Sequence, residues 1–150
     1  VETLEQIRDR FLSPELVYPK FAREVKTFRA EDTLADVFHS ITETDFSQYP
    51  VYRQGAYIGL LTENGITRWL AHHSVHVLTL VELEEVQIDQ VLSREEQRKN
   101  DAFIARTTTA QDAENYFVQN PLLEALLITT AGKPGEKLLG IITRWDVLRI

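Results

Sequence analysis

The sequence has no cysteine and no methionine, and only six glycines and five prolines among 150 residues. Without cysteine a disulfide framework is excluded, and a reducing cytoplasmic compartment is expected. No apolar run approaches the roughly 20 residues of a membrane span, and the N-terminal VETLEQIRDR is too polar for a signal peptide. Because methionine is absent and the chain stops at Ile150, soon after an expected helix start, we expect a fragment of a longer protein or trimmed tails.

Positive charge is also scarce. The chain has 16 Lys and Arg against 23 Asp and Glu, for a net charge of −7. A general nucleic-acid binder needs a basic face for phosphates, so that class is not expected. A small anionic ligand remains compatible with the composition, since a local pocket can oppose the global sign. The hydrophobic content of 43% is ordinary for a soluble globular protein.

The sequence contains an internal repeat, but its register differs from the one that its most conspicuous identical letters suggest. The letters ITRW occur at 66–69 and again at 142–145. That register would place an Asn-Gly pair inside a strand, which both residues disfavour. Two short β-rich segments align instead on Gly59 and Gly140, which lie 81 positions apart. The ITRW echo is therefore interpreted as a coincidence.

A second alignment joins two helical segments, each beginning after a threonine. Thr33-Leu-Ala-Asp-Val and Thr109-Ala-Gln-Asp-Ala lie 76 positions apart, and each has helical apolar spacing after a residue suited to an N-cap. The two offsets differ by five residues. We assign these to the Gly/Pro-rich loop after Thr129, which replaces a short turn after Arg53, because surface turns tolerate insertion best.

The pattern predicts an α+β fold made of two β-α-β-β-α repeats. The first copy is expected to comprise strand 24–28, helix 34–42, strands 49–53 and 56–62, and helix 63–73. The second is expected to comprise strand 102–106, helix 110–119, strands 125–129 and 137–143, and a helix from 144 onward. Segments 11–13 and 91–93, one before each repeat, are expected to correspond. The repeats are expected to divide the chain into 1–76 and 77–150. Units this small should pack together about a pseudo-twofold axis, with a cleft between matching strand ends.

Thr143 and Asp146 are the strongest candidate site residues. Thr143 ends a predicted strand at the start of a helix, where free backbone N–H groups favour an anion. Asp146 follows in the first turn, and an ionised carboxylate accepts hydrogen bonds from a diol such as that of ribose. The local alternative is that Thr-x-x-Asp is only a helix capping box.

Three segments, in order, give the chain a resemblance to tandem CBS-domain (Bateman) modules. They are GIITRWDVL at 140–148, SQYPV at 47–51 and RAEDTL at 29–34. The resemblance implies a regulatory sensor that binds adenosine nucleotides, or in some members cyclic di-AMP or S-adenosylmethionine, in the cleft between the repeats. It also implies disc-like homodimers and a possible regulated protein partner.

The resemblance also implies the site residues. Asp146 would hold the ribose, Thr143 would lie beside phosphate, and Arg144 and Lys26 would be phosphate counter-charges. Adenine would be read largely by backbone of the other copy, at the following residues: Lys26, Thr27, Phe46, Ser47, Gln48, Tyr49 and Pro50. No catalytic residue, metal ligand or cofactor is expected, and the nucleotide would be a regulatory ligand.

The first copy departs from this pattern. At the position of Asp146 it has Gly65, and at that of Arg144 it has Glu63. Thr62 is therefore expected to be only a helix cap, and one competent mononucleotide site per chain is predicted.

Other motifs have plainer interpretations. His72, His73 and His76 are expected to be solvated rather than metal ligands. The charged stretch 82–101 is expected to be a solvated linker and helix surface joining the copies, with partner docking as the alternative. Trp69 and Trp145 are expected to pack helices, with adenine stacking as the alternative.

With no nucleophile elbow or phosphate-cradling glycine loop, an enzyme is not expected. Two hypotheses result: a nucleotide-sensing module, or a ligand-free interaction and dimerisation module, with a cyclic di-AMP receptor as a variant of the first.

Overall fold

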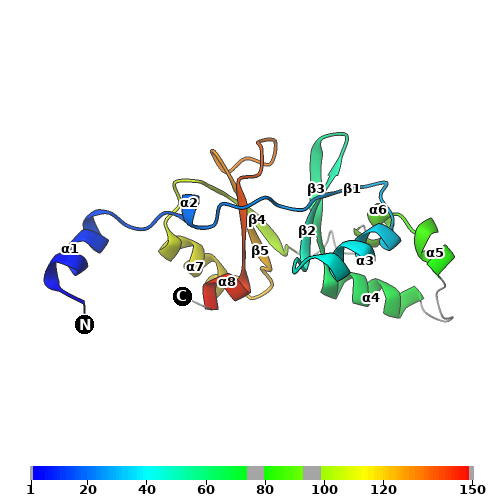
Figure 1. The fold of residues 1–150 in the computed structure, drawn as a ribbon, viewed down its shortest axis with the longest axis horizontal. Helices are drawn as coiled ribbons and strands as arrows, with labels where there is room; N and C mark the ends of the chain where they lie inside the picture. Colours follow the sequence, from blue (N-terminus) through cyan, green and yellow to red (C-terminus); the bar gives the residue numbers. More distant parts are fainter. Residues whose placement is uncertain (1, 74–79, 93–98, 149–150) are drawn as a thin grey trace. The chain divides into compact units, whose positions relative to one another are not determined.

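The computed structural model describes residues 2–73, 80–92 and 99–148 (Figure 1). Contacts divide the chain into two units: Val1–Val25 with Asp101–Ile150, here called the C-unit, and Lys26–Asn100, here called the N-unit. Each unit contains a three-stranded sheet, β1-β2-β3 in the N-unit and β4-β5-β6 in the C-unit. Over the described residues, no helix combines the length and the apolar character needed to cross a membrane.

The N-unit is built around the first repeat. In chain order its elements are β1 (Phe28–Arg29), α3 (Leu34–Glu43), β2 (Gln48–Arg53), β3 (Ala56–Thr62), α4 (Glu63–His73), α5 (Leu80–Glu85) and α6 (Ile88–Leu92). Strand β2 pairs parallel with β1 and antiparallel with β3. The fully buried Leu34, Tyr49 and Val91 show that α3, the sheet and α6 share one core.

The C-unit is built around the second repeat and begins with α1 (Leu4–Leu12). Its remaining elements are α2 (Val17–Lys20), β4 (Asp101–Ala105), α7 (Ala110–Gln119), β5 (Ala125–Thr129), β6 (Gly140–Thr143) and α8 (Arg144–Leu148). Strand β5 pairs parallel with β4 and antiparallel with β6, and all five of its residues are buried. Such a fully buried strand explains its nearly continuous apolar sequence.

The predicted α+β fold with two repeats is confirmed. Helices 63–73 and 110–119 and strands 56–62 and 125–129 have the expected bounds. Thr33 and Thr109 are the N-caps of α3 and α7, and each side-chain oxygen accepts the N–H of an aspartate three residues on. The ITRW echo is a coincidence, since its first copy lies within α4 and its second crosses from β6 into α8.

Two predicted strands are shorter in the structure. The strand expected at 24–28 is only Phe28–Arg29, because the ladder to β2 consists of two residue pairs. The strand expected at 137–143 begins at Gly140. Strand propensity alone does not extend a strand beyond the edge that pairs with it.

The prediction that all five inserted residues lie in the hairpin loop is wrong. Phe28 pairs with Val51 and Ile104 pairs with Ile128, so the middle strands of the two sheets correspond at 77 positions rather than 76. One extra residue therefore precedes β5, and four lie between β5 and β6.

The expected correspondence of 11–13 with 91–93 is wrong. Leu16 bridges to Thr109, whereas Gln87 bridges to Thr33, so α2 corresponds to α6. Val17 N donates to Thr108 O at 2.8 Å, just as Ile88 N donates to Asp32 O at 2.8 Å. Each of these short helices thus packs in the unit that holds the other copy's sheet. The predicted boundary at 76/77 lies outside the described residues and stays a prediction.

The two tryptophans differ. Trp69 is 7% exposed within the N-unit core, so its predicted packing role is confirmed. Trp145 is 68% exposed, so its predicted packing role is wrong.

Candidate functional site

The candidate site lies at the junction of β6 and α8, where Thr143 precedes the first turn of the helix. Asp146 Oδ2 accepts the backbone N–H of Thr143 at 2.8 Å and its hydroxyl at 3.1 Å. A third donor is the guanidinium of Arg23, whose Nη2 lies 3.0 Å from the same oxygen. The Asp146 side chain is 26% exposed. The structure thus brings the two predicted residues together and adds a cation to them.

Arg23 is the site residue that sequence reasoning missed. It belongs to the lead-in segment, defined here as residues 16–23, and lies 123 positions before Asp146 in the chain. Its Nε and Nη2 donate to the carbonyl of Ile141 at 3.2 and 2.7 Å. Ala22 bridges to Gly140, which places Arg23 beside β6. No local pattern marks this residue, because its partners come from the far end of the chain.

Capping alone does not make Asp146 special. Asp36 Oδ2 accepts the N–H of Thr33 at 3.0 Å and its hydroxyl at 3.1 Å, which is the same arrangement at the start of α3. What distinguishes Asp146 is the ion pair with Arg23, since no arginine pairs with Asp36 within the described residues of the N-unit, where Arg29 pairs with Asp32 instead. Asp146 Oδ1 accepts no hydrogen bond from the part of the chain that the structure describes.

Arg144 lies in the first turn of α8 but reaches away from Asp146 toward the end of α7. Its guanidinium donates to four backbone carbonyls at 2.8–3.4 Å, those of Phe117, Asn120, Pro121 and Leu123. It also lies 5.4 Å from the centroid of the Phe117 ring. Phe117 and Asn120 lie at the end of α7, and Pro121 and Leu123 lie in the loop that follows, so Arg144 joins the end of α7 to this loop. Its predicted contact with phosphate stays a prediction.

The residues predicted to read adenine lie in the N-unit around the start of β2. Ser47 O accepts the N–H of Glu63 at 3.2 Å, and the Ser47 hydroxyl donates to Gln48 Oε1 at 2.9 Å. Phe46 O accepts the hydroxyl of Tyr49 at 2.7 Å. Two of the backbone carbonyls in this segment are therefore already hydrogen-bonded within the N-unit.

Tyr49 and Pro50 are core residues of the N-unit. Both are buried, and the Tyr49 ring packs edge-on against Phe28 at 5.1 Å between centroids. Lys26 and Thr27 are exposed just before β1, and Lys26 Nζ lies 5.0 Å from the Phe28 centroid. These residues belong to the N-unit, whereas Asp146 belongs to the C-unit.

The corresponding position of the first repeat has a cap without a carboxylate. Thr62 Oγ1 accepts the N–H of Gly65 at 3.0 Å, and Thr62 is buried. The predicted capping role of Thr62 is confirmed. Because glycine supplies no acceptor, this end of β3 lacks the group that would hold a sugar diol.

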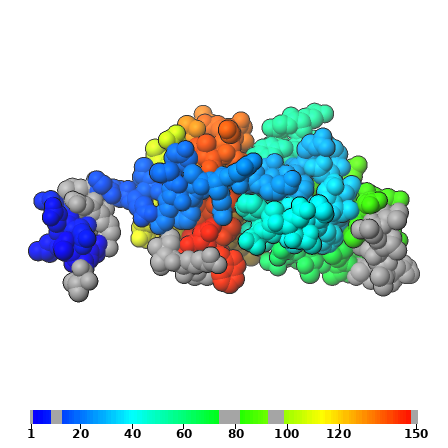
Figure 2. All heavy atoms as spheres, viewed as in Figure 1, coloured from blue at the N-terminus to red at the C-terminus, as the bar shows by residue number. Residues whose placement is uncertain are grey.

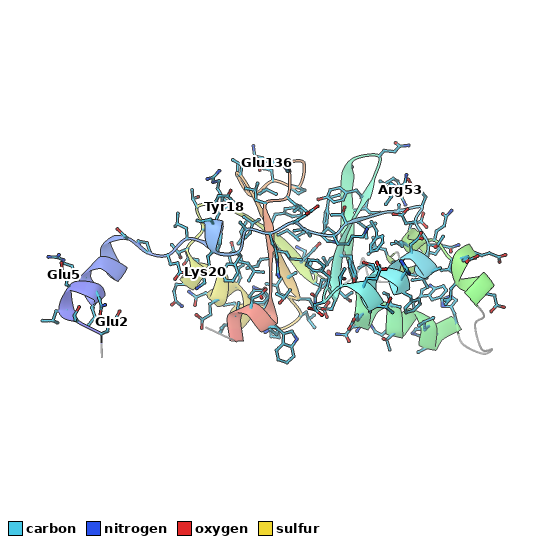
Figure 3. The ribbon with its side chains drawn as sticks, viewed as in Figure 1. Glu2, Glu5, Tyr18, Lys20, Arg53 and Glu136 are labelled. Carbon is cyan, nitrogen blue, oxygen red and sulfur yellow. The ribbon has the colours of Figure 1, made fainter. Side chains whose placement is uncertain are left out.

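A second ordered carboxylate lies outside the candidate site, in the loop between β5 and β6 (Figure 3). Glu136 Oε1 accepts the N–H groups of Ala131 and Lys133 at 2.9 and 3.0 Å, and the hydroxyl of the buried Thr129 at 3.1 Å. The two backbone hydrogen bonds hold the pKa of Glu136 below its ordinary value. This carboxylate stabilises the loop between β5 and β6, which is longer than the corresponding turn of the first repeat.

Histidine and carboxylate side chains do not gather into a cluster in the described chain. Over residues 2–73, 80–92 and 99–148, no three His, Asp or Glu side chains form a group that could hold a metal ion. His72 and His73 are exposed at the end of α4, and His73 Nδ1 lies 2.9 Å from Trp69 O. His76 lies outside the described residues.

Comparison with known proteins gives one family match. A profile of the CBS domain matches residues 21–72 and 96–150. No curated protein sequence matches the chain.

Several solved structures have the same fold. A putative acetoin utilization protein from Vibrio cholerae is similar, with a TM-score of 0.66 and 16% identity over 89% of this chain and 87% of the other. The CBS domain of a membrane protein from Sphaerobacter thermophilus is similar with a TM-score of 0.67 and 18% identity, over 97% of this chain and 95% of the other. The CBS domains of a transcriptional regulator from Streptococcus pneumoniae are similar with a TM-score of 0.59 and 20% identity, over 90% of this chain and 98% of the other. At these identities the likeness establishes the fold alone.

Proposed function

Because the chain belongs to the CBS-domain family, whose paired repeats are regulatory modules rather than catalysts, we propose that it senses an adenosine nucleotide. The observation that carries the proposal is the arrangement of Thr143, Asp146 and Arg23 at the end of β6. It combines a partly exposed carboxylate, suited to a ribose diol, with a guanidinium that holds this carboxylate and offsets its negative charge toward an anionic ligand. The first repeat has Gly65 at the same position, so the proposal is one mononucleotide site per chain.

Asp146 is assigned the ribose hydroxyls through Oδ1, because Oδ2 already accepts three hydrogen bonds. Thr143 is assigned the phosphate side of the site. Lys26, Thr27 and the backbone around Ser47 are proposed to contribute adenine contacts from the other repeat. The sensor is proposed to act in the cytoplasm as a homodimer that controls a protein partner.

Calorimetric titration of the full chain with AMP, ATP and cyclic di-AMP tests the proposal. Asp146→Ala should weaken binding of the preferred nucleotide about 10- to 100-fold, since hydrogen bonds to a charged group contribute about 1.5–3 kcal/mol. Asp36→Ala is the matched control, because it removes the same capping geometry at the start of α3, where no arginine pairs with the described carboxylate. Equal affinity in wild type and Asp146→Ala would remove the basis for this site.

A ligand-free interaction module is the second candidate, and exposed apolar side chains favour it. Val118, Leu122 and Trp145 are 72%, 64% and 68% exposed in the C-unit. A nucleotide panel in a thermal-shift assay separates the two candidates, because a ligand at 100 times its Kd stabilises the fold by about 2.7 kcal/mol. No shift with any nucleotide would favour the interaction module.

A further inference from the structure

Arg23 joins the candidate site to the N-terminal part of the chain. We infer that Arg23 is a positioning residue that couples nucleotide binding at Asp146 to docking of the lead-in segment on the C-unit. The inference rests on the proposed function. It adds a residue, and a direction of signalling, that the Thr-x-x-Asp motif does not contain.

The lead-in segment is docked along its length. Val17 is fully buried and donates its N–H to Thr108 O at 2.8 Å. At the other end, Ala22 bridges to Gly140 and Arg23 N donates to Leu139 O at 3.2 Å. In Figure 2 this blue segment lies across the orange and red residues of the same unit. The docking surface thus comprises the turn at Thr108 and Thr109 before α7 and the strand that ends in Thr143.

The Arg23 side chain connects this backbone docking to the carboxylate. One nitrogen, Nη2, lies 2.7 Å from Ile141 O and 3.0 Å from Asp146 Oδ2. A forked guanidinium can hold a carbonyl and a carboxylate at once, which the single ammonium of lysine does less well. The lead-in segment therefore cannot leave β6 without releasing Asp146.

Charge determines the direction of the coupling. The Arg23 and Asp146 side chains are 36% and 26% exposed, so a bound ligand would meet both. With Arg23 in place, Asp146 is held in one orientation and its negative charge is opposed by a cation. An anionic nucleotide should then bind more tightly than when Asp146 stands alone, since like charges repel. By reciprocity, the nucleotide must strengthen docking of the lead-in segment by the same factor.

Residues 13–15 connect α1 to the lead-in segment, so a change in docking of this segment can reach the N-terminal helix. A ligand shifts a conformational equilibrium only through its different affinities for the two states. Here the states are the docked and undocked lead-in, and Arg23 supplies the difference in affinity. The first repeat has Gly65 in place of Asp146 and so has no carboxylate for such a connection.

The titrations use three variants of the full chain. Arg23→Met removes the charge but keeps an unbranched apolar stem, and Arg23→Lys keeps the charge without the fork. Arg53→Met is the matched control, because Arg53 is also an exposed arginine paired with one aspartate, Asp89, at 3.3 Å, but lies in the N-unit. Thermal unfolding of each variant establishes that it folds.

Titration with AMP and with adenosine provides the first readout. Arg23→Met should lower AMP affinity about 10-fold, within the usual range of couplings, and adenosine affinity by less. Arg23→Lys should recover part of the loss, and Arg53→Met should bind as wild type does. A role in stability alone would lower the melting temperature without separating AMP from adenosine. AMP affinity in Arg23→Met within about twofold of wild type would overturn the inference while leaving the proposed function intact.

Hydrogen exchange of the lead-in amides provides the second readout. In wild type, saturating AMP should slow exchange at Val17 and Arg23, and in Arg23→Met it should not. Without ligand, Asp146→Asn and Arg23→Met should each speed exchange there, and this arm needs no nucleotide. Unchanged lead-in exchange in both variants would overturn the coupling. If wild type binds no nucleotide at all, the proposed function fails, and the ligand-dependent part of the inference fails with it.

Discussion

Gly140 is the position where one added methyl group should do the most damage to lead-in docking. A Cβ built on Gly140 would overlap the carbonyl oxygen of Phe21 and lie 3.1 Å from its carbonyl carbon. Ordinary carbon–oxygen contacts are about 3.3 Å or longer. The obstacle is backbone rather than the flexible end of a side chain, so Gly140→Ala must move the lead-in segment away from β6.

The expected loss of stability follows from the contacts that this movement disturbs. Overpacking a well-packed site costs about 1–3 kcal/mol. Moving the segment also weakens the bonds from Arg23 to Leu139 O and Ile141 O, at about 0.5–1.5 kcal/mol each. Since relaxation trades one cost against the other, we expect Gly140→Ala to lower the free energy of unfolding by about 2–4 kcal/mol.

Urea unfolding followed by circular dichroism measures this difference. Gly135→Ala is the matched control, because a Cβ at Gly135 meets nothing within 4 Å. The control should stay within about 0.5 kcal/mol of wild type, as surface substitutions usually do. If Gly140→Ala were as stable as Gly135→Ala, the close approach of the lead-in segment to β6 would be refuted, and the argument for Arg23 with it.

Two further predictions concern side chains outside the ligand contacts assigned above. Arg144→Met should lower the free energy of unfolding by about 1–2 kcal/mol, because it removes the guanidinium that donates to the carbonyls of Pro121 and Leu123 after α7. If the loss appeared in nucleotide affinity instead of thermal unfolding, the structural role of Arg144 would be wrong. Glu136→Gln should be less stable than wild type at neutral pH, because the carboxylate accepts backbone N–H groups in the loop between β5 and β6. The lowered folded-state pKa of Glu136 means that its contribution is present above the ordinary glutamate pKa and is lost as pH falls through the folded value. The gap in melting temperature between wild type and Glu136→Gln should therefore narrow from pH 7 toward pH 3, and a constant gap would contradict this reasoning.

Local chemistry in the sequence was sufficient to predict most secondary structure. Thr33 and Thr109 cap helices whose apolar spacing is visible in the printed letters, and Gly59 and Gly140 align the last strands of the two repeats. These signals act over a few residues, so a linear pattern contains them in full. The same locality allowed Thr143 and Asp146 to be placed together, since three positions in one helical turn are neighbours whatever the tertiary fold.

Only the tertiary structure decided which distant groups complete these local pieces. The pairing of Arg23 with Asp146 spans 123 positions, and the shortening of β1 depends on which edge pairs with it. The contacts of Arg144 with the carbonyls after α7 likewise join residues more than 20 positions apart. The physical reason is the same in each case. A charged side chain or a strand edge forms its hydrogen bonds with whichever group the packing of the fold brings near. Because that group is distant in the chain, the neighbouring residues do not indicate which one it is.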